Sequence, residues 1–172
     1  MKRSLVLTLI GPDQPGIVEK LSKVLASHGG NWQESSMSRL GGQFAGILIA
    51  SVDEGAMEPL LAGLQALSAD GLRVVAETEL CETSARAGRM VRLELLGNDK
   101  PGIVREISSA LASRGVSVDS LETEVVSGSM SADLLFKAEA VLLVPPSTDL
   151  DDLQAVLEAI AADLMVDITL AD

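Results

Sequence analysis

The chain carries the segment Gly11-Pro12-Asp13-Gln14-Pro15-Gly16-Ile17-Val18, and it carries it twice. The second copy, 86 residues later, is Gly97-Asn98-Asp99-Lys100-Pro101-Gly102-Ile103-Val104. When the comparison is extended to Gly29 and Gly115, 11 of 19 aligned positions are identical. In both copies an apolar run precedes the segment and a helical pattern of apolar residues follows it. The sequence therefore predicts a tandem repeat of two units.

Each copy is interpreted as the turn between a strand and a helix. Pro15 and Pro101 then fall in the first helical turn, where a missing N–H costs little. Gly16 and Gly102 leave backbone amides uncovered at the positive end of the helix, where a carboxylate can dock. This interpretation gives both glycines a negative φ, so that a valine there would leave the domain folded. The alternative is that Asp-x-Pro-Gly only starts a helix.

The first unit is predicted to contain four strands and two helices. Gly41-Gly42 forms a hairpin turn, and Asp53 caps the second helix. The predicted elements are a strand over 5–10, a helix over 15–28, strands over 31–40 and 43–52, a helix over 57–69 and a strand over 72–80.

The second unit repeats the order strand, helix, strand, strand, helix, strand. Its hairpin turn is placed at 127–129, and Ser147, Thr148 or Asp149 caps its second helix. Its strands are predicted over 91–96, 116–126, 130–144 and 165–170. The βαββαβ order predicts an α+β fold of two ferredoxin-like domains in tandem, with antiparallel sheets and helices on one face. The predicted boundaries are 1–81 for the first domain, 82–88 for a linker and 89–172 for the second domain.

Composition and charge exclude several classes of function. The net charge of −12 argues against direct binding to nucleic acid and to anionic membranes, which both need clustered cations. Aromatic residues make up only 2% of the chain, too few for an RNA-binding platform. The apolar run at the N-terminus is too short to span a membrane, so we expect the cytoplasm.

The side chains needed for catalysis or metal binding are scarce. His28 is the only histidine and Cys81 the only cysteine, which excludes an intrachain disulfide and a thiolate cluster. The loops carry Asp13 and Asp99 instead of a nucleophile with a base. We therefore expect no catalytic residue, no metal and no cofactor, and an enzyme is the weaker alternative.

The repeated segment, followed by a helix that ends in glycine and by Asn31 at the start of the next strand, resembles an ACT domain, an amino-acid-sensing module of metabolic regulation. Two such units without an attached enzyme resemble the glycine cleavage system transcriptional repressor family. The resemblance implies that ACT domains pair side by side into one longer sheet and bind an amino acid at the shared edge. The apolar run over 45–50 agrees with a shared sheet.

The resemblance places the ligand at the loop after the first strand and at the start of the second strand. Backbone amides would hold its α-carboxylate, Asp13 or Asp99 would meet its α-ammonium group, and Asn31 would orient either group. Because Asn31 aligns with Ser117, the sites need not share a ligand, and we expect the first to matter more. The candidate residues are Gly11, Asp13, Gln14, Pro15, Gly16, Ile17 and Asn31, and Gly97, Asn98, Asp99, Pro101, Gly102, Ile103 and Ser117.

These observations predict a non-catalytic regulatory protein that binds a small amino acid and modulates a partner protein. The resemblance makes the partner a transcription regulator of glycine or one-carbon metabolism, and makes the chain a homo-oligomer, a dimer. The alternatives are an assembly module that binds no ligand and a regulatory subunit of a metabolic enzyme.

Overall fold

The structure, a computed structural model, describes residues 1–78, 85–130 and 132–172. The chain divides into two compact units, residues 1–83 and 84–172. Cys81, the end of the predicted strand over 72–80 and the start of the predicted linker lie outside the described residues. Each unit is described below by itself.

The first unit has the predicted βαββαβ order. Its strands are β1 (Lys2–Pro12), β2 (Asn31–Leu40), β3 (Gln43–Asp53) and β4 (Arg73–Glu77), and its helices are α1 (Ile17–Ser27) and α2 (Met57–Ala66). Short 3-10 helices over Glu54–Ala56 and Leu67–Asp70 flank α2. The strands form one antiparallel sheet in the order β2-β3-β1-β4.

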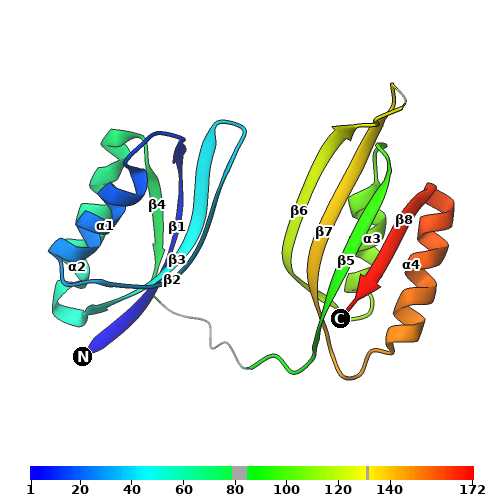
Figure 1. The fold of residues 1–172 in the computed structure, drawn as a ribbon. Coiled ribbons are helices and arrows are strands. Elements are labelled where there is room, and N and C mark those ends of the chain that lie inside the picture. Colours follow the sequence, from blue (N-terminus) through cyan, green and yellow to red (C-terminus); the bar gives the residue numbers. More distant parts are fainter. Residues whose placement is uncertain (79–84, 131) are drawn as a thin grey trace. The chain divides into compact units, whose positions relative to one another are not determined.

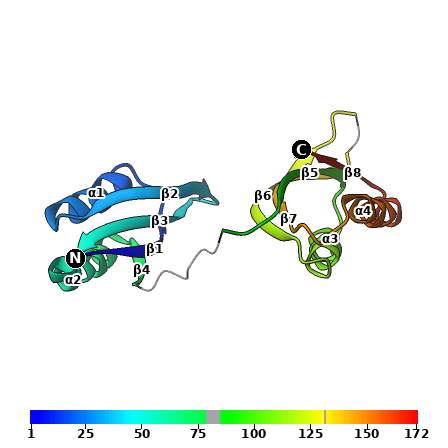
Figure 2. The ribbon, with the colours of Figure 1, turned by 90° about the horizontal axis from the view of Figure 1, so that it is seen from below.

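The second unit repeats this architecture. Its strands are β5 (Arg89–Asn98), β6 (Ser117–Ser127), β7 (Leu134–Val144) and β8 (Val166–Ala171), and its helices are α3 (Ile103–Ala112) and α4 (Leu150–Leu164). The sheet order is β6-β7-β5-β8, again antiparallel. Both helices of a unit lie on one face of its sheet (Figures 1 and 2). The predicted fold class is confirmed.

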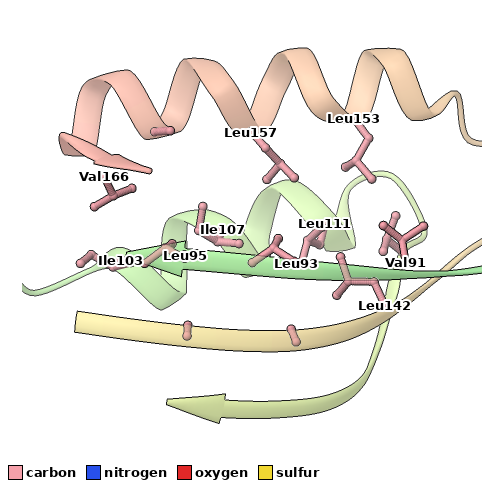
Figure 3. Packing of buried hydrophobic residues seen from close by; sticks show 14 of the residues in the cluster. Val91, Leu93, Leu95, Ile103, Ile107, Leu111, Leu142, Leu153, Leu157 and Val166 are labelled. Carbon is pink, nitrogen blue, oxygen red and sulfur yellow. The ribbon is translucent and has the colours of Figure 1, made fainter. Parts of the chain in front are cut away.

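Alternating leucines build the core between the helices and the sheet. In β1, Leu5, Leu7 and Leu9 are at most 1% exposed, and they pack with leucines of α1 and α2. In the second unit Leu93 of β5 packs with Leu153 and Leu157 of α4 (Figure 3). Burying each such side chain stabilises the unit by about 1.5–3 kcal/mol. A chain with few aromatics thus obtains two cores that are almost entirely aliphatic.

The two hairpins differ in length. Gly41 and Gly42 have φ of 58° and 75°, the left-handed values of a tight two-residue hairpin turn, which confirms the predicted turn. In the second unit β7 begins at Leu134, so the prediction of a strand from residue 130 was wrong. The backbone N–H of Gly128 donates to the carbonyl of Asp133 at 3.1 Å and closes a longer connection. Met130, at which the strand was predicted to begin, is 98% exposed and does not pack against the core.

The start of α4 was predicted correctly, whereas the cap of α2 was not. The Asp149 side chain accepts a hydrogen bond of 2.9 Å from the backbone N–H of Asp151, as a helix cap does. Asp53 makes no capping bond, because the chain first enters the 3-10 helix over Glu54–Ala56. The predicted cap at Asp53 was therefore wrong, and α2 starts three residues later than a helix capped by Asp53 would.

This contrast predicts different costs for two matched substitutions. Asp149→Ala should lower the free energy of unfolding by about 1 kcal/mol, because a capping bond is lost. Asp53→Ala, the control, should change it by less than about 0.5 kcal/mol. Thermal unfolding of both variants checks this, and equal losses would contradict the assignment of Asp149 as the cap.

Candidate functional site

The repeated loop has the same geometry in both units. In the first unit the backbone N–H of Asp13 donates to the carbonyl of Gly42 at 3.0 Å. In the second the N–H of Asp99 donates to the carbonyl of Leu134 at 2.9 Å. The loop that precedes the first helix is thus held against the end of the neighbouring hairpin in each unit.

The helices begin after the glycines and not at the prolines. Gly16 and Gly102 are the N-cap residues, and their φ angles of 90° and 93° are left-handed. The predictions that Pro15 and Pro101 lie in the first helical turn, and that both glycines have a negative φ, were wrong. The reason for expecting a valine at either glycine to be tolerated is thereby removed. A left-handed residue at this point turns the chain sharply from the loop into the helix, and glycine adopts that conformation without strain.

The backbone amides at both helix starts are free of side-chain caps. The first helical hydrogen bonds run from Lys20 N–H to Gly16 O at 2.9 Å and from Glu106 N–H to Gly102 O at 3.0 Å. No side chain caps either helix among the described residues. The earlier N–H groups of each helix point outward at its positive end. This part of the sequence-based interpretation, an anion-accepting helix start, is compatible with the structure.

Gly11 and Gly97 owe their small size to packing. A Cβ at Gly97 would lie 2.3 Å from Cγ1 and 2.8 Å from Cα of Val166, the first residue of β8. A Cβ at Gly11 would lie 3.0 Å from the carbonyl oxygen of Gly71. In each unit the segment that enters the last strand crosses over this glycine. The glycine is therefore explained without any ligand.

The first loop borders a hollow of about 310 Å³ with paired charges beside it. The hollow is lined by Asp13, Gln14, Gly16, Ile17, Val18, Glu19 and Phe44. The Asp13 carboxylate, a predicted partner for an ammonium group, lies 3.2 Å from the Arg39 guanidinium. Glu19 lies 2.7 Å from the Lys23 ammonium, and its hydrogen bond and attraction to Lys23 lower the pKa of Glu19. These paired carboxylates flank the helix start that would receive an anion.

The second loop carries one more positive charge than the first, because Lys100 stands where the first loop has Gln14. In the first helical turn the order of charges is exchanged, from Glu19-Lys20 to Arg105-Glu106. The Arg105 side chain is 83% exposed and lies 3.1 Å from the carboxylate of its neighbour Glu106. Four further candidate residues are accessible in the loops: Pro15, Asn98, Asp99 and Pro101. Ile103, by contrast, is only 3% exposed and belongs to the core, and the half-buried Ile17 packs against the core of the first unit.

Asn31 and Ser117 lie far from the loops of their own units. Asn31 pairs with Ser51 at one end of β3, whereas the loop contacts the other end of that strand. Ten residues of β2 separate the two ends, roughly 30 Å. Ser117 pairs with Leu143 and stands in the corresponding place. The structure thus brings the loop residues of each unit together but does not bring Asn31 or Ser117 to them.

Three residues beside the loops were missed by sequence reasoning. Lys100 and Arg105 could have been found by comparing the charges of the aligned copies. Arg39 is visible only once the β2–β3 hairpin is folded back on the loop, since 26 residues separate it from Asp13.

His28 Nδ1 lies 2.8 Å from the carbonyl of Val24, four residues earlier in the chain.

Among the described residues, no three metal-ligating side chains lie close enough together to hold a metal ion. Within the same ranges, no helix is long and apolar enough to cross a membrane.

The two units with their repeated glycine loops define a tandem of ferredoxin-like modules. Residues 3–75 match the ACT domain family, and residues 91–164 match it a second time. Both matches are to ACT domains, and neither is to a catalytic domain. The chain belongs to the ACT domain family and is a tandem ACT domain protein.

Solved structures resemble the chain over its full length. An unknown protein from Galdieria sulphuraria is 26% identical with a TM-score of 0.83, and the match covers 99% of this chain and 98% of that one. A structure titled "putative glycine cleavage system transcriptional repressor" is 20% identical with a TM-score of 0.71, and the match covers 99% and 97%. At that identity the second structure shows the shared fold.

A curated relative matches a shorter part of the chain. It is a UPF0237 protein of Methanopyrus kandleri, 41% identical over 49 residues, which are 28% of this chain and 54% of the relative. The chain thus spans about half the length of the curated relative that it matches.

The left-handed glycines predict a loss of stability that does not depend on any ligand. Gly16→Ala and Gly102→Ala should each lower the free energy of unfolding by about 1–2 kcal/mol, because a Cβ strains a left-handed residue. Gly55→Ala is the control, since a Cβ there meets nothing within 4 Å and its φ is not left-handed. Thermal denaturation measures the difference, and unchanged stability of both loop variants would contradict the helix-start geometry.

The Glu19–Lys23 pair predicts a small dependence on pH. Because Lys23 lowers the pKa of Glu19, the pair stabilises the folded chain above the unfolded pKa, and this is lost as the pH falls through the folded pKa. Lys23→Gln should raise the pKa of Glu19 towards its ordinary value, which an NMR titration of the Glu19 carboxyl measures. An unchanged pKa would mean that the ion pair does not form in solution.

Proposed function

We propose that this protein is a non-catalytic regulator that binds a small amino acid at its loop–helix starts and thereby modulates a partner protein. The observation that carries the proposal is the repeated helix start, where uncapped amides follow a left-handed glycine in both ACT domains. Amides at a positive helix end suit an α-carboxylate. A nearby carboxylate, Asp13 or Asp99, suits the α-ammonium group.

The second loop is the stronger candidate for the carboxylate. Lys100 adds a positive charge beside the free amides of α3 that the first loop, with Gln14, lacks. In the first helical turns Glu19 is followed by Lys20 and Arg105 by Glu106, so each of these pairs is neutral as a whole. Attraction to an anion is favoured by cations within the first turn. The sequence-based expectation that the first site matters more rested on Asn31, which lies at the far end of its own sheet.

Assembly belongs to the proposal because of where Asn31 and Ser117 lie. Because Asn31 and Ser117 lie at the end of the sheet away from the loop of their own unit, they can reach only a ligand on the loop of a neighbouring unit. This requires the β2 or β6 edge strands of the two units to lie side by side in opposite directions. Side-by-side pairing of strand edges, in a homodimer, satisfies this condition.

The proposed partner is a transcription regulator of glycine or one-carbon metabolism in the cytoplasm. Its support is the full-length similarity to the structure whose title names a repressor of the glycine cleavage system. The net charge of −12 disfavours direct contact with DNA, so the chain would act through another protein.

Calorimetric titration of the full chain with each common amino acid tests the proposal. At least one should bind, and Arg105→Glu should weaken it about threefold to tenfold, since the charge beside the α3 amides is reversed. Arg92→Glu is the control, because it makes the same change on the exposed face of β5.

Two outcomes would contradict the proposal in different ways. No heat with any amino acid would favour an assembly module without ligand or a regulatory subunit of a metabolic enzyme. Binding that Arg105→Glu and Arg92→Glu leave unchanged would place the amino acid away from the second loop.

A further inference from the structure

The face of the first sheet that points away from α1 and α2 is mostly apolar on β1, β3 and β4, where Thr8 lies between Ile47 and Val75. On β2 the same face is polar, with Glu34, Ser36 and Ser38. The alternation of core residues in β1, β3 and β4 leaves the other side chains on this face, with Ile47 54% exposed and Val75 59% exposed. In Figure 1 both helices lie on the opposite side of the sheet. We call this surface the apolar sheet face, and it consists of Val6, Ile10, Ala45, Ile47, Ile49 and Val75.

The second unit shows that the fold does not require this composition. By strand register Glu139 occupies the place of Ile47, Lys137 that of Ala45 and Arg92 that of Val6. Glu139 also lies directly opposite Glu94 and Glu122 on the neighbouring strands. A sheet of this architecture is therefore compatible with charged residues on its free face. The apolar face of the first unit calls for a cause outside that unit.

We propose that the apolar sheet face is the docking surface for a second copy of the chain, with the two faces packed against each other. Two such faces would bury β-branched side chains at the spacing of stacked sheets, about 10 Å. A charged face such as that of the second unit is a poor occupant, since it would bury glutamates without partners. A second copy presents the apolar surface that matches.

The charges at the border of the face select one arrangement. Arg73 and Glu77 lie on β4 at opposite ends of the face, beside Ile10 and Val6. A two-fold axis across the strands lays β4 on the second copy's β4 in the opposite direction, so that each Arg73 meets a Glu77. A two-fold axis along the strands would instead bring Glu77 close to Glu34 of the second copy, which repels. The face is thus complementary to itself only in the first arrangement.

This contact does not depend on the amino-acid site. It uses the flat face of the sheet, whereas the side-by-side pairing proposed above uses the edges of β2 and β6. Loss of the face contact and loss of ligand binding can therefore be measured separately.

Sedimentation of the full chain over a wide range of concentration tests the face. The wild-type protein should self-associate, and Ile47→Glu should weaken this about tenfold or more, because it buries a charge. The fold should tolerate the change, since the second unit carries Glu139 at that place. Glu139→Gln is the control and should leave the association unchanged. A monomeric wild-type protein would overturn the proposal and would leave a different protein as the occupant of the face. Self-association of the Ile47→Glu variant as strong as that of the wild type would also overturn it.

Exchange of the two border charges tests the arrangement without touching an apolar residue. Arg73→Glu alone, and Glu77→Arg alone, should each weaken self-association about threefold to tenfold, because like charges then meet. The double variant R73E/E77R should restore it, since each pair re-forms with reversed charges. A double variant as weak as the single ones would overturn the two-fold arrangement.

Discussion

The one-sided burial of each sheet is the constraint on which the rest of the structure depends. Leucines at every second position of β1 and β5 fix which face the helices cover, and this core is closely similar in the two units. Outside the core, some features of the two units are alike and others differ. The helix starts stay alike, whereas the charges beside them and the composition of the opposite sheet face diverge.

The repeated loop obeys a second constraint, which is conformational. A left-handed Gly16 or Gly102 turns the chain into its helix, and a hydrogen bond from the preceding aspartate's backbone holds the loop against the neighbouring hairpin. The same geometry leaves the first amides of the helix without a side-chain cap. A structural requirement thus produces the feature that makes a carboxylate site, and the side chains around it decide whether the site attracts an anion.

The fold could be predicted from the sequence because its signals are local. The alternation of apolar residues indicates β1 and β5, Gly41-Gly42 indicates the hairpin turn, and Asp149 indicates the start of α4. Each of these signals depends on only a few neighbouring residues. The φ of Gly16 could not be predicted, since proline followed by glycine suits both a helix start and a turn before it. The pairing of Asp13 with Arg39, and the distance of Asn31 from the loop, depend on strand register across the sheet. Position 97 requires glycine because Val166 packs against it, and Val166 is distant in sequence, in the last strand.

The central claim is that an amino acid binds at the helix starts, and amide chemical shifts test it most directly. In a titration of the isotope-labelled full chain, the account predicts that at least one common amino acid shifts the amides of Ile103, Val104 and Arg105 most strongly. Saturable shifts confined to other parts of the chain, or no shifts with any amino acid, would contradict it.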